Sequence, residues 1–248
     1  MAKKNGPAQS APEVWFVGAG PGDPDLITVK GQRLVKEAGV LIYAGSLVNP
    51  ALVAESGAEV KRDSWGMHLQ DMVDVMVQHA RAGKKVVRLH SGDPSLYGAI
   101  VEQIELLETQ GVAVRIVPGV SSLFAAAAAL KTQLTLRGVS ESVIVTRPAG
   151  KTLEKDQIRE FSRMNSTMVV FLGTEKLAEI TGRLDCPKDT PAAVVYHASW
   201  PDEKVVRGTV ADIAGKAAAA GIEHTALLVV GGVAGNTKEG HTRSHLYS

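Results

Sequence analysis

The chain has 248 residues and a mass of 26.1 kDa, with 27 Lys and Arg against 26 Asp and Glu. Hydrophobic residues make up 45% of it and charged residues 21%, which excludes a wholly disordered protein and allows one large domain or two compact ones. A net charge of +1 lacks the basic excess of a dedicated binder of nucleic acid or of anionic membranes. The single cysteine, Cys186, excludes an intramolecular disulfide and a cysteine-based zinc site, and is compatible with a reducing cytoplasm.

The two ends of the chain are polar or rich in small residues. Residues 1–12 are basic but have no apolar stretch behind them, so they do not form a signal peptide. Nowhere does the sequence approach the ~18–20 consecutive apolar residues that a membrane-spanning helix needs. We therefore expect a cytoplasmic protein with disordered tails at 1–12 and 236–248.

Short β-rich runs alternate with amphipathic stretches of helical length, which is typical of an α/β fold with mainly parallel sheets and crossover helices. The turn at Pro118 predicts a boundary between an N-terminal α/β domain, 13–118, and a C-terminal one, 119–235. In the first domain the pattern predicts strands at 14–17, 40–43, 85–89 and 112–117, and helices at 24–38, 69–82 and from the turn at 92–94 to Gly111. In the second it predicts strands at 143–146, 168–172, 192–195, 205–207 and 226–230, and helices at 121–130, 153–164, 175–183 and 210–220.

The glycine-rich turn after the first strand does not fit a dinucleotide site. Gly18 and Gly20 match the Gly-x-Gly-x-x-Gly fingerprint, but Asp23 occupies the third glycine position. Pro21 has no N–H to offer a pyrophosphate, and no acidic residue closes the second strand to hold a ribose. The sequence therefore argues against NAD.

Other catalytic templates also fail. The phosphate-binding P-loop would need a glycine where Val145 stands, five residues before Gly150. The close histidine pair, His241 and His245, lies in the polar tail, and no nucleophile-elbow sequence surrounds the serines at 121 and 122. We expect no metal site, and neither hydrolysis nor phosphoryl transfer.

Three turns remain distinctive. Gly-Asp-Pro occurs at 22–24 and at 92–94, each time after a predicted strand and before a predicted helix, and the turn at 118–122 (PGVSS) precedes a third helix. Taken singly, such a turn is efficient helix capping. Together, three such loops at the carboxyl ends of strands predict a small-ligand site. Its acidic, carbonyl-rich loops favour a cationic ligand without phosphate.

Residues 17–28 (VGAGPGDPDLIT) are similar to the opening signature of the tetrapyrrole (corrin and porphyrin) methylase family. Matching blocks follow in the family's order at 87–94 (VRLHSGDP), 117–122 (VPGVSS), 134–137 (LTLR) and 208–209 (GT), so the resemblance spans about residues 14–233. It implies the two-domain class III methyltransferase fold, with S-adenosyl-L-methionine bound in the cleft between the domains and converted to S-adenosyl-L-homocysteine. It also implies a homodimer and a carboxylate-rich tetrapyrrole substrate that is methylated on carbon.

The same resemblance implies the site residues. The cofactor contacts carried over from the family are Pro21, Ser91, Gly92, Asp93, Leu96, Ser121, Ser122, Leu172, Ala198, Thr225 and Ala226. Two of them depart from the family: Ser91 replaces a common glycine, and Leu172 replaces a common methionine of nearly equal volume. The candidates for substrate contact are Tyr43, Ser46, Met67, His68, Tyr97 and Arg137, the last as a carboxylate clamp. No catalytic residue is assigned, because an enamine-like tetrapyrrole carbon is already nucleophilic and needs no dedicated strong base.

Several alternatives stay open. The chain could be any of several family members that methylate different precorrin or uroporphyrinogen carbons. The family resemblance also covers diphthine synthesis and ribosomal-RNA cytidine methylation, although the near-neutral charge argues against RNA. A non-catalytic S-adenosyl-methionine sensor is an alternative of another class, and a nicotinamide oxidoreductase is the third. The sequence does not decide between a metal-free and a cobalt-loaded macrocycle.

Overall fold

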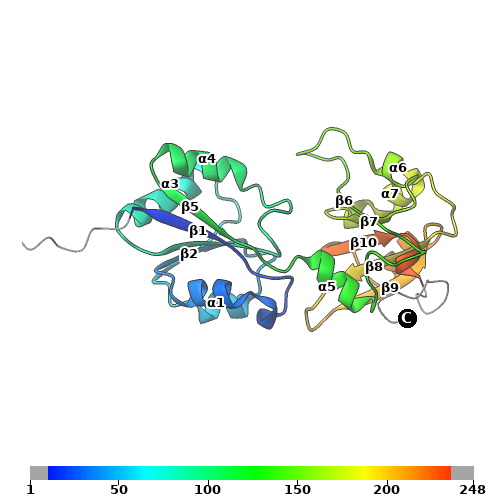
Figure 1. Ribbon diagram of the computed structural model, residues 1–248, viewed down its shortest axis with the longest axis horizontal. Helices are drawn as coiled ribbons and strands as arrows, with labels where there is room; N and C mark the ends of the chain where they lie inside the picture. Colours follow the sequence, from blue (N-terminus) through cyan, green and yellow to red (C-terminus); the bar gives the residue numbers. More distant parts are fainter. Residues whose placement is uncertain (1–10, 236–248) are drawn as a thin grey trace, which may run out of the picture. The chain divides into compact units, whose positions relative to one another are not determined.

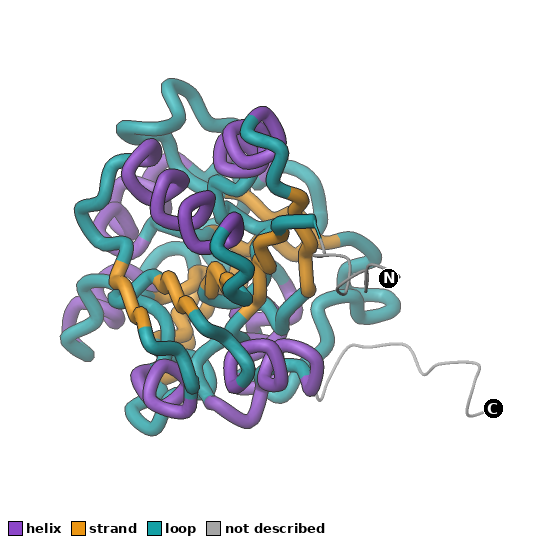
Figure 2. The backbone as a smooth tube through the Cα atoms, turned by 90° about the vertical axis from the view of Figure 1, so that its left-hand side faces the viewer, coloured by secondary structure: helices purple, strands orange, loops and turns teal. Residues whose placement is uncertain are grey.

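The computed structural model describes residues 11–235, which form two compact units, the first ending at Ser122 and the second beginning at Leu123. Each unit contains one five-stranded sheet with helices on both of its faces (Figures 1 and 2). The α/β class expected from the sequence is confirmed. The boundary expected after Pro118 lies a few residues before this division, and the two expected tails fall outside the described residues, except for 11 and 12.

The first unit has an all-parallel sheet with the strand order β3-β2-β4-β1-β5. Its helices α1 and α2 pack on one face of the sheet, and α3 and α4 on the other. The elements are β1 (Glu13–Gly18), η1 (Pro24–Leu26), α1 (Val29–Lys36), β2 (Val40–Tyr43), α2 (Pro50–Glu55), β3 (Val60–Asp63), α3 (Leu69–Arg81), β4 (Val86–His90), α4 (Val101–Thr109) and β5 (Ala113–Val117). Because the strands are parallel, all five C-terminal ends lie at the same edge of the sheet.

The second unit has the strand order β6-β7-β10-β8-β9, and only its β6–β7 pairing is parallel within the described chain. The expectation of mainly parallel sheets therefore fails in this unit, because the hairpin β8–β9 and the strand β10 run against their neighbours. The elements are α5 (Ser122–Ala129), β6 (Val143–Thr146), α6 (Ile158–Phe161), β7 (Thr167–Val170), η2 (Thr174–Lys176), α7 (Leu177–Arg183), β8 (Pro191–Tyr196), β9 (Lys204–Thr209), α8 (Ile213–Ala219), β10 (Ala226–Val230) and η3 (Gly232–Ala234). Helix α5 packs on one face of the sheet, and α6, α7 and α8 on the other.

Each sheet lies between two apolar clusters. Successive residues of its central strands alternate between the two clusters, so these strands are buried on both faces. In β1, Val14 and Phe16 face α3 and α4, while Val17 faces α1 and α2. In β10, Leu228 faces α7 and α8, while Leu227 and Val229 face α5. A strand that is covered on both faces reads as a continuous apolar run, which is why β1, β4, β8 and β10 are correctly predicted from the sequence.

The prediction of one helix over 24–38 is wrong about where the helix begins. Asp23 and Pro24 begin only the short 3-10 turn η1, in which the Asp23 carboxylate accepts the Asp25 amide at 2.9 Å. The chain then becomes extended at Ile27, and the Thr28 side chain caps a separate helix, α1, by accepting the Gly31 amide at 3.1 Å. A threonine four residues after a proline is the capping signal that identifies this second start.

Two other helices are shorter than predicted. The turn at 92–94 does not open a helix, because α4 begins only at Val101, after a loop in which Tyr97 and Ala99 have positive φ. The helix predicted at 153–164 reduces to the single turn α6, because the Asp156 carboxylate turns back to accept the Ala149 and Ile158 amides. In addition, α2 and β3 were not predicted.

Candidate functional site

Three loops meet at the C-terminal edge of the first sheet: 18–23 after β1, 91–96 after β4 and 118–122 after β5. The Gly20 amide donates to the Gly92 carbonyl at 3.3 Å, and the Gly92 amide donates to the Gly20 carbonyl at 2.7 Å. The Gly119 amide donates to Asp93 Oδ2 at 2.8 Å and so joins the third loop to the second. We call these three loops the first half-site. They bring together seven of the predicted cofactor residues: Pro21, Ser91, Gly92, Asp93, Leu96, Ser121 and Ser122.

The first half-site is closed by glycine backbones in direct contact. A Cβ on Gly119 would lie 2.1 Å from the Gly92 carbonyl oxygen and 2.7 Å from the Gly18 Cα. A Cβ on Gly18 would lie 2.5 Å from the Gly119 Cα. Real Cβ atoms do not approach backbone so closely, so both positions require glycine. The packing brings the backbones of the three loops into direct contact, with no side chain between them.

The Asp93 carboxylate holds the first half-site together. Its Oδ1 accepts the Ser95 amide at 2.8 Å and the Ser95 hydroxyl, while its Oδ2 accepts the Gly119 amide. Burial alone would raise the pKa of Asp93, but the hydrogen bonds from Ser95 and from the Gly119 amide outweigh it, and the pKa lies below its usual value. Asp93 is therefore ionised at neutral pH and is committed to its own loop.

A second cluster of predicted cofactor residues lies at one edge of the second sheet. Register pairs Ala226 with Tyr196 and Leu228 with Val170, so the end of β7, the end of β8 and the start of β10 share this edge. The Thr174 hydroxyl donates to the Ala226 carbonyl at 3.0 Å and accepts the Ala226 amide at 3.1 Å. The His197 amide donates to the Thr225 carbonyl at 3.3 Å. We call residues 171–174, 196–200 and 225–226 the second half-site; they hold the predicted Leu172, Ala198, Thr225 and Ala226.

Backbone strain gathers at these loops. In the described chain, the non-glycine residues with positive φ are Tyr97, Ala99, Lys131, Leu172, His197, Ser199 and Thr225. Leu172 and Thr225 belong to the predicted cofactor set, and His197 and Ser199 flank Ala198 on either side. Left-handed backbone at a non-glycine residue costs about 1–3 kcal/mol and persists where the surroundings hold it, commonly at ligand sites. This observation supports the location of the second half-site independently of the family resemblance.

The second half-site contains an aromatic and ionic group that the sequence reasoning missed. His197 Nδ1 lies 3.0 Å from both carboxylate oxygens of Asp202, and the imidazole stacks on Tyr196 with a centroid distance of 3.9 Å. Trp200 lies tilted against the same imidazole, with a centroid distance of 5.3 Å. The hydrogen bond from His197 lowers the pKa of Asp202. The signal was available in the stretch 196–202 (YHASWPD), from which only Ala198 was selected.

The candidate substrate residues fall into two groups. Five of them lie at the C-terminal edge of the first sheet: Tyr43 is the last residue of β2, and Ser46, Met67, His68 and Tyr97 lie in the loops that follow β2, β3 and β4. The structure therefore places these five on the edge that also carries the first half-site. Arg137 belongs to the second unit, in the exposed turn that follows α5 and leads to β6.

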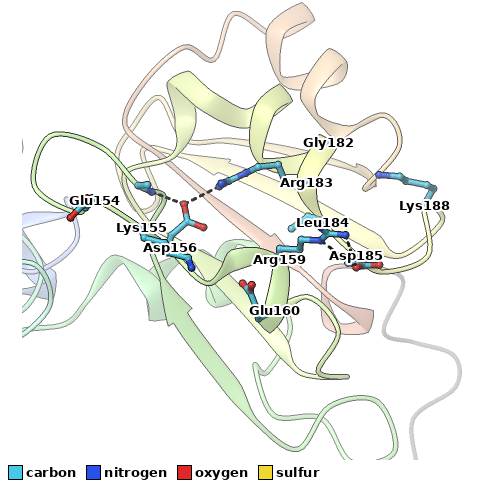
Figure 3. Close-up of a pocket in the computed structure, with 11 residues that line it drawn as sticks. Glu154, Lys155, Asp156, Arg159, Glu160, Gly182, Arg183, Leu184, Asp185 and Lys188 are labelled. Atoms are coloured by element: carbon cyan, nitrogen blue, oxygen red, sulfur yellow. Dashed lines mark hydrogen bonds and ion pairs between the residues drawn. The ribbon is translucent and has the colours of Figure 1, made fainter.

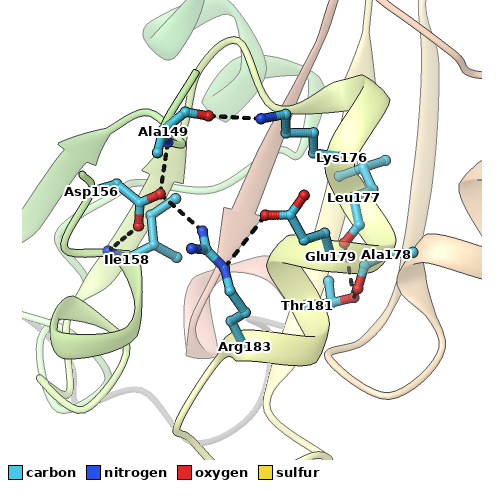
Figure 4. Close-up of polar contacts among 9 residues, drawn as sticks. All are labelled: Ala149, Asp156, Ile158, Lys176, Leu177, Ala178, Glu179, Thr181 and Arg183. Carbon is cyan, nitrogen blue, oxygen red and sulfur yellow. Dashed lines mark hydrogen bonds and ion pairs between the residues drawn. The ribbon is translucent and has the colours of Figure 1, made fainter. Parts of the chain in front are cut away.

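An open pocket of about 690 Å³ lies elsewhere, between α6 and α7 in the second unit, and none of the predicted site residues lines it (Figure 3). Its charges neutralise one another. Arg183 pairs with Asp156 at 2.9 Å, and Arg159 pairs with Asp185 at 3.4 Å (Figures 3 and 4). Asp156 also accepts two backbone amides, which with Arg183 outweigh the burial that would raise its pKa, so the pKa is lowered. We interpret the ion pairs that line this pocket as a structural network that holds the loop before α6 in place.

Two classes of feature are absent from residues 11–235. No three His, Cys, Asp or Glu side chains in this range come together in a way that could hold a metal ion. Among the helices of the same range, none has the length and apolar character needed to cross a membrane.

The chain is similar to known methylases. Residues 13–214 match the family described as Tetrapyrrole (Corrin/Porphyrin) Methylases, and the chain belongs to this family. Among its relatives, the cobalt-precorrin-4 C(11)-methyltransferase of Methanocaldococcus jannaschii is 53% identical over 228 residues, which is 89% of this chain and 88% of the relative. The precorrin-4 C(11)-methyltransferase of Pseudomonas aeruginosa is 46% identical over 94% of each chain.

Solved structures agree with the family assignment. The X-ray structure of a cobalt precorrin-4 methyltransferase matches with a TM-score of 0.88 and 42% identity, covering 92% of this chain and 98% of that chain. The uroporphyrin-III C-methyltransferase of Thermus thermophilus, complexed with S-adenosyl homocysteine, matches with a TM-score of 0.76 and 32% identity over 89% of this chain and 92% of that chain.

Proposed function

We propose that the protein is an S-adenosyl-methionine-dependent methyltransferase that adds a methyl group to C-11 of precorrin-4, or of cobalt-precorrin-4, in cobalamin biosynthesis. The observation that carries this proposal is the 53% identity, over nearly the full length of both chains, to a relative named for that reaction. Three stretches of this sequence carry the likeness to the precorrin-4 enzymes in particular, namely 41–50 (LIYAGSLVNP), 91–98 (SGDPSLYG) and 196–208 (YHASWPDEKVVRG).

The first half-site fits a methyl donor that is a sulfonium rather than a nucleotide diphosphate. Pro21 has no amide proton, and the Asp93 carboxylate is ionised beside the loop backbone, so a pyrophosphate would lose a donor and meet a like charge. Glycine contacts at 18 and 119 hold the backbones of the three loops close together, with no side chain between them. A Thermus thermophilus relative complexed with S-adenosyl homocysteine supports the same donor class. We propose that the donor contacts both half-sites.

The chemistry requires positioning more than acid–base catalysis. S-adenosyl-methionine supplies an activated methyl group: its carbon–sulfur bond breaks, sulfur keeps the electron pair, and a carbon–carbon bond forms at the substrate. The residues of this chain have to align the donor with the nucleophilic carbon and to exclude water. The rigid glycine contacts of the first half-site and the strained loops of the second are suited to that task, and no residue is assigned as a dedicated base.

The test is an incubation with labelled methyl donor, followed by NMR to locate the label. The purified protein is mixed with S-adenosyl-methionine carrying a ¹³C-methyl group and with precorrin-4, and the position of the label is found by NMR. Label at C-11 is the expected result, and cobalt-precorrin-4 is tested in parallel. Label at another carbon would indicate a relative with different regiochemistry, while bound donor without transfer would indicate a sensor. A fluorescence titration with NADH excludes or supports an oxidoreductase.

Two further parts of the proposal concern assembly, which the family resemblance implies, and location, for which the single cysteine and the lack of a long apolar segment are the support. We propose that the enzyme acts as a homodimer and that it works in the cytoplasm. Sedimentation equilibrium over a range of concentrations tests the first, and a mass of one chain at micromolar concentration would contradict it. Fractionation of the source cells tests the second.

A further inference from the structure

A buried cation lies in the middle of the first sheet. Arg88 is the third residue of β4 and keeps only 6% of its surface exposed. His90 and Gln103 are also buried, at 5% and 3%. Arg88 and His90 lie on the same face of β4, because residues two apart in a strand point the same way. This face is the one covered by α3 and α4.

The protein does not satisfy this cation. Arg88 Nε has no hydrogen-bond partner, and Nη1 makes only long contacts, 3.3 Å to the Leu89 carbonyl and 3.5 Å to the Ile42 carbonyl. Both carbonyls lie near the C-terminal ends of β4 and β2, so the guanidinium points toward the edge that carries the first half-site. Burial lowers the pKa of Arg88 to about 10, despite the attraction of Asp63, so the side chain stays charged at neutral pH.

The carboxylate that attracts Arg88 already accepts two backbone amides. Asp63, at the end of β3, attracts Arg88 electrostatically, but its Oδ1 accepts the Gly45 amide at 3.0 Å and the Trp65 amide at 2.9 Å. These bonds join the loops that follow β2 and β3. His90 adds no negative charge, because burial and the neighbouring Arg88 lower its pKa to about 3 and it is neutral. An incompletely paired buried charge destabilises the fold, so its presence favours a functional role.

The edge above Arg88 is rimmed by exposed apolar side chains. Trp65 is 79% exposed in the loop after β3, and Val101 is 62% exposed at the start of α4. Leu47, Leu69 and Tyr97, each about two-fifths exposed, complete this set, and all five follow the ends of β2, β3 or β4. Large exposed apolar side chains at one sheet edge are typical of a ligand surface. An apolar edge toward which a buried guanidinium points is complementary to a macrocycle that carries carboxylates.

We propose that Arg88 binds a carboxylate of the tetrapyrrole substrate, while the apolar rim formed by Leu47, Trp65, Leu69, Tyr97 and Val101 contacts the face of its ring. The inference rests on the proposed function, because it takes the substrate class from there. A carboxylate at the sheet edge would give the guanidinium a charge-assisted hydrogen bond in place of the long Nη1 contacts to carbonyls. We therefore expect Arg88 to determine specificity for an acidic macrocycle and not to contact the methyl donor.

The test measures binding separately from catalysis. Uroporphyrin III, a stable tetrapyrrole with eight carboxylates, is titrated into the wild-type enzyme and into Arg88→Met and Arg88→Lys, with binding followed by tryptophan fluorescence. We expect Arg88→Met to weaken binding by about tenfold or more, and Arg88→Lys to weaken it by less, because lysine keeps the charge but loses the planar fork. We also expect Arg88→Met to retain the affinity for S-adenosyl homocysteine and to melt at the same temperature or higher.

Arg115→Met is the matched control, because Arg115 lies on β5, has a side chain that is 64% exposed and is paired with Glu13 at 3.5 Å. It should bind uroporphyrin III as the wild type does. Failure of Arg88→Met to fold, unchanged uroporphyrin binding, or an equal loss of affinity for S-adenosyl homocysteine would each overturn the proposal. A wild-type enzyme that binds uroporphyrin III through Arg88 but transfers no methyl group to precorrin-4 would instead contradict the proposed function.

Discussion

At the scale of single residues, Asp93 is the side chain on which the first half-site most depends. Its carboxylate accepts hydrogen bonds from Ser95 and from the Gly119 amide. In Asp93→Asn the charge is lost and the acceptors weaken, so we expect a loss of about 1–3 kcal/mol in unfolding free energy. We also expect the dissociation constant of S-adenosyl homocysteine to rise at least about tenfold, measured by calorimetry.

The pH dependence of that variant follows from the sign of the shift. The pKa of Asp93 in the folded protein lies below the ordinary value of 3.8, so the carboxylate contributes stability above that value and loses it as the pH falls through the folded pKa. The difference in unfolding free energy between wild type and Asp93→Asn should therefore be greatest at neutral pH and shrink below about pH 3.8. Urea unfolding at pH 7, 4 and 3 measures it.

Asp156→Asn is the matched control for Asp93. Asp156 likewise accepts two backbone amides, but it lies beside the pocket between α6 and α7, which no predicted cofactor residue lines (Figure 4). We expect it to lose stability and to keep its affinity for S-adenosyl homocysteine. If both variants lost affinity equally, Asp93 would have no particular role in cofactor binding.

Arg137 is expected to act on the substrate rather than on the cofactor. Its guanidinium is exposed in the second unit, and a carboxylate clamp at the surface contributes through charge-assisted hydrogen bonds. Arg137→Ala should raise the KM for precorrin-4 by about fivefold to twentyfold, leaving the dissociation constant of S-adenosyl homocysteine unchanged. Steady-state kinetics with varied precorrin-4 checks this. An unchanged KM would show that the residue is not a clamp.

At the scale of elements, the loops of the first half-site tolerate no added atom at Gly119. In Gly119→Ala the new methyl group meets the backbone of Gly92 and Gly18 at once, and neither can rotate away. We expect a loss of about 3 kcal/mol or more in unfolding free energy and a large loss of cofactor affinity. Gly215→Ala in α8 is the control, because nothing lies within 4 Å of its added methyl group; it should stabilise the protein by up to about 1 kcal/mol. Thermal unfolding with and without S-adenosyl homocysteine tests both variants.

The elements also show what a sequence pattern can and cannot predict. Strands buried on both faces, such as β1 and β10, are continuous apolar runs and are predicted to within a residue or two. The start of α1 and the length of α6 depend on single side chains, Thr28 and Asp156, that turn back onto the chain. The four-residue β3 is largely exposed and leaves no such pattern. Local polar contacts of this kind decide where a helix begins and ends, even where hydrophobic periodicity predicts otherwise. They form only in the folded chain, so the pattern does not reveal them.

The candidate site also has parts that the sequence predicts and parts that it does not. Motifs at 18–24, 91–98 and 118–122 predict the first half-site, because glycine, proline and aspartate specify backbone turns directly. Arg88 was passed over as part of an ordinary strand, since its exceptional feature, a buried cation with an unpartnered Nε, is visible only after the helices cover the sheet. The antiparallel strands of the second sheet likewise escape a pattern that records burial but not direction.

At the scale of the whole molecule, the decisive question is whether one ligand engages both units. Each unit has its own sheet and apolar clusters, so each can respond to a ligand separately. Amide hydrogen exchange measures, residue by residue, whether a ligand stabilises each unit. The reporters for the first half-site are the Gly20, Gly92 and Gly119 amides, and those for the second are the His197 and Ala226 amides, because each donates a hydrogen bond to a neighbouring segment of its half-site.

Saturation with S-adenosyl homocysteine should slow exchange at all five amides, since a ligand at a hundred times its dissociation constant stabilises the state that binds it by about 2.7 kcal/mol. The Ala149 and Ile158 amides, which donate to Asp156 beside the pocket between α6 and α7, serve as internal controls. Their exchange by local opening should not change. Slowing in the first unit alone would mean that the donor is held by the glycine loops without Leu172, Ala198, Thr225 and Ala226, and the strained backbone of the second half-site would then need a different ligand.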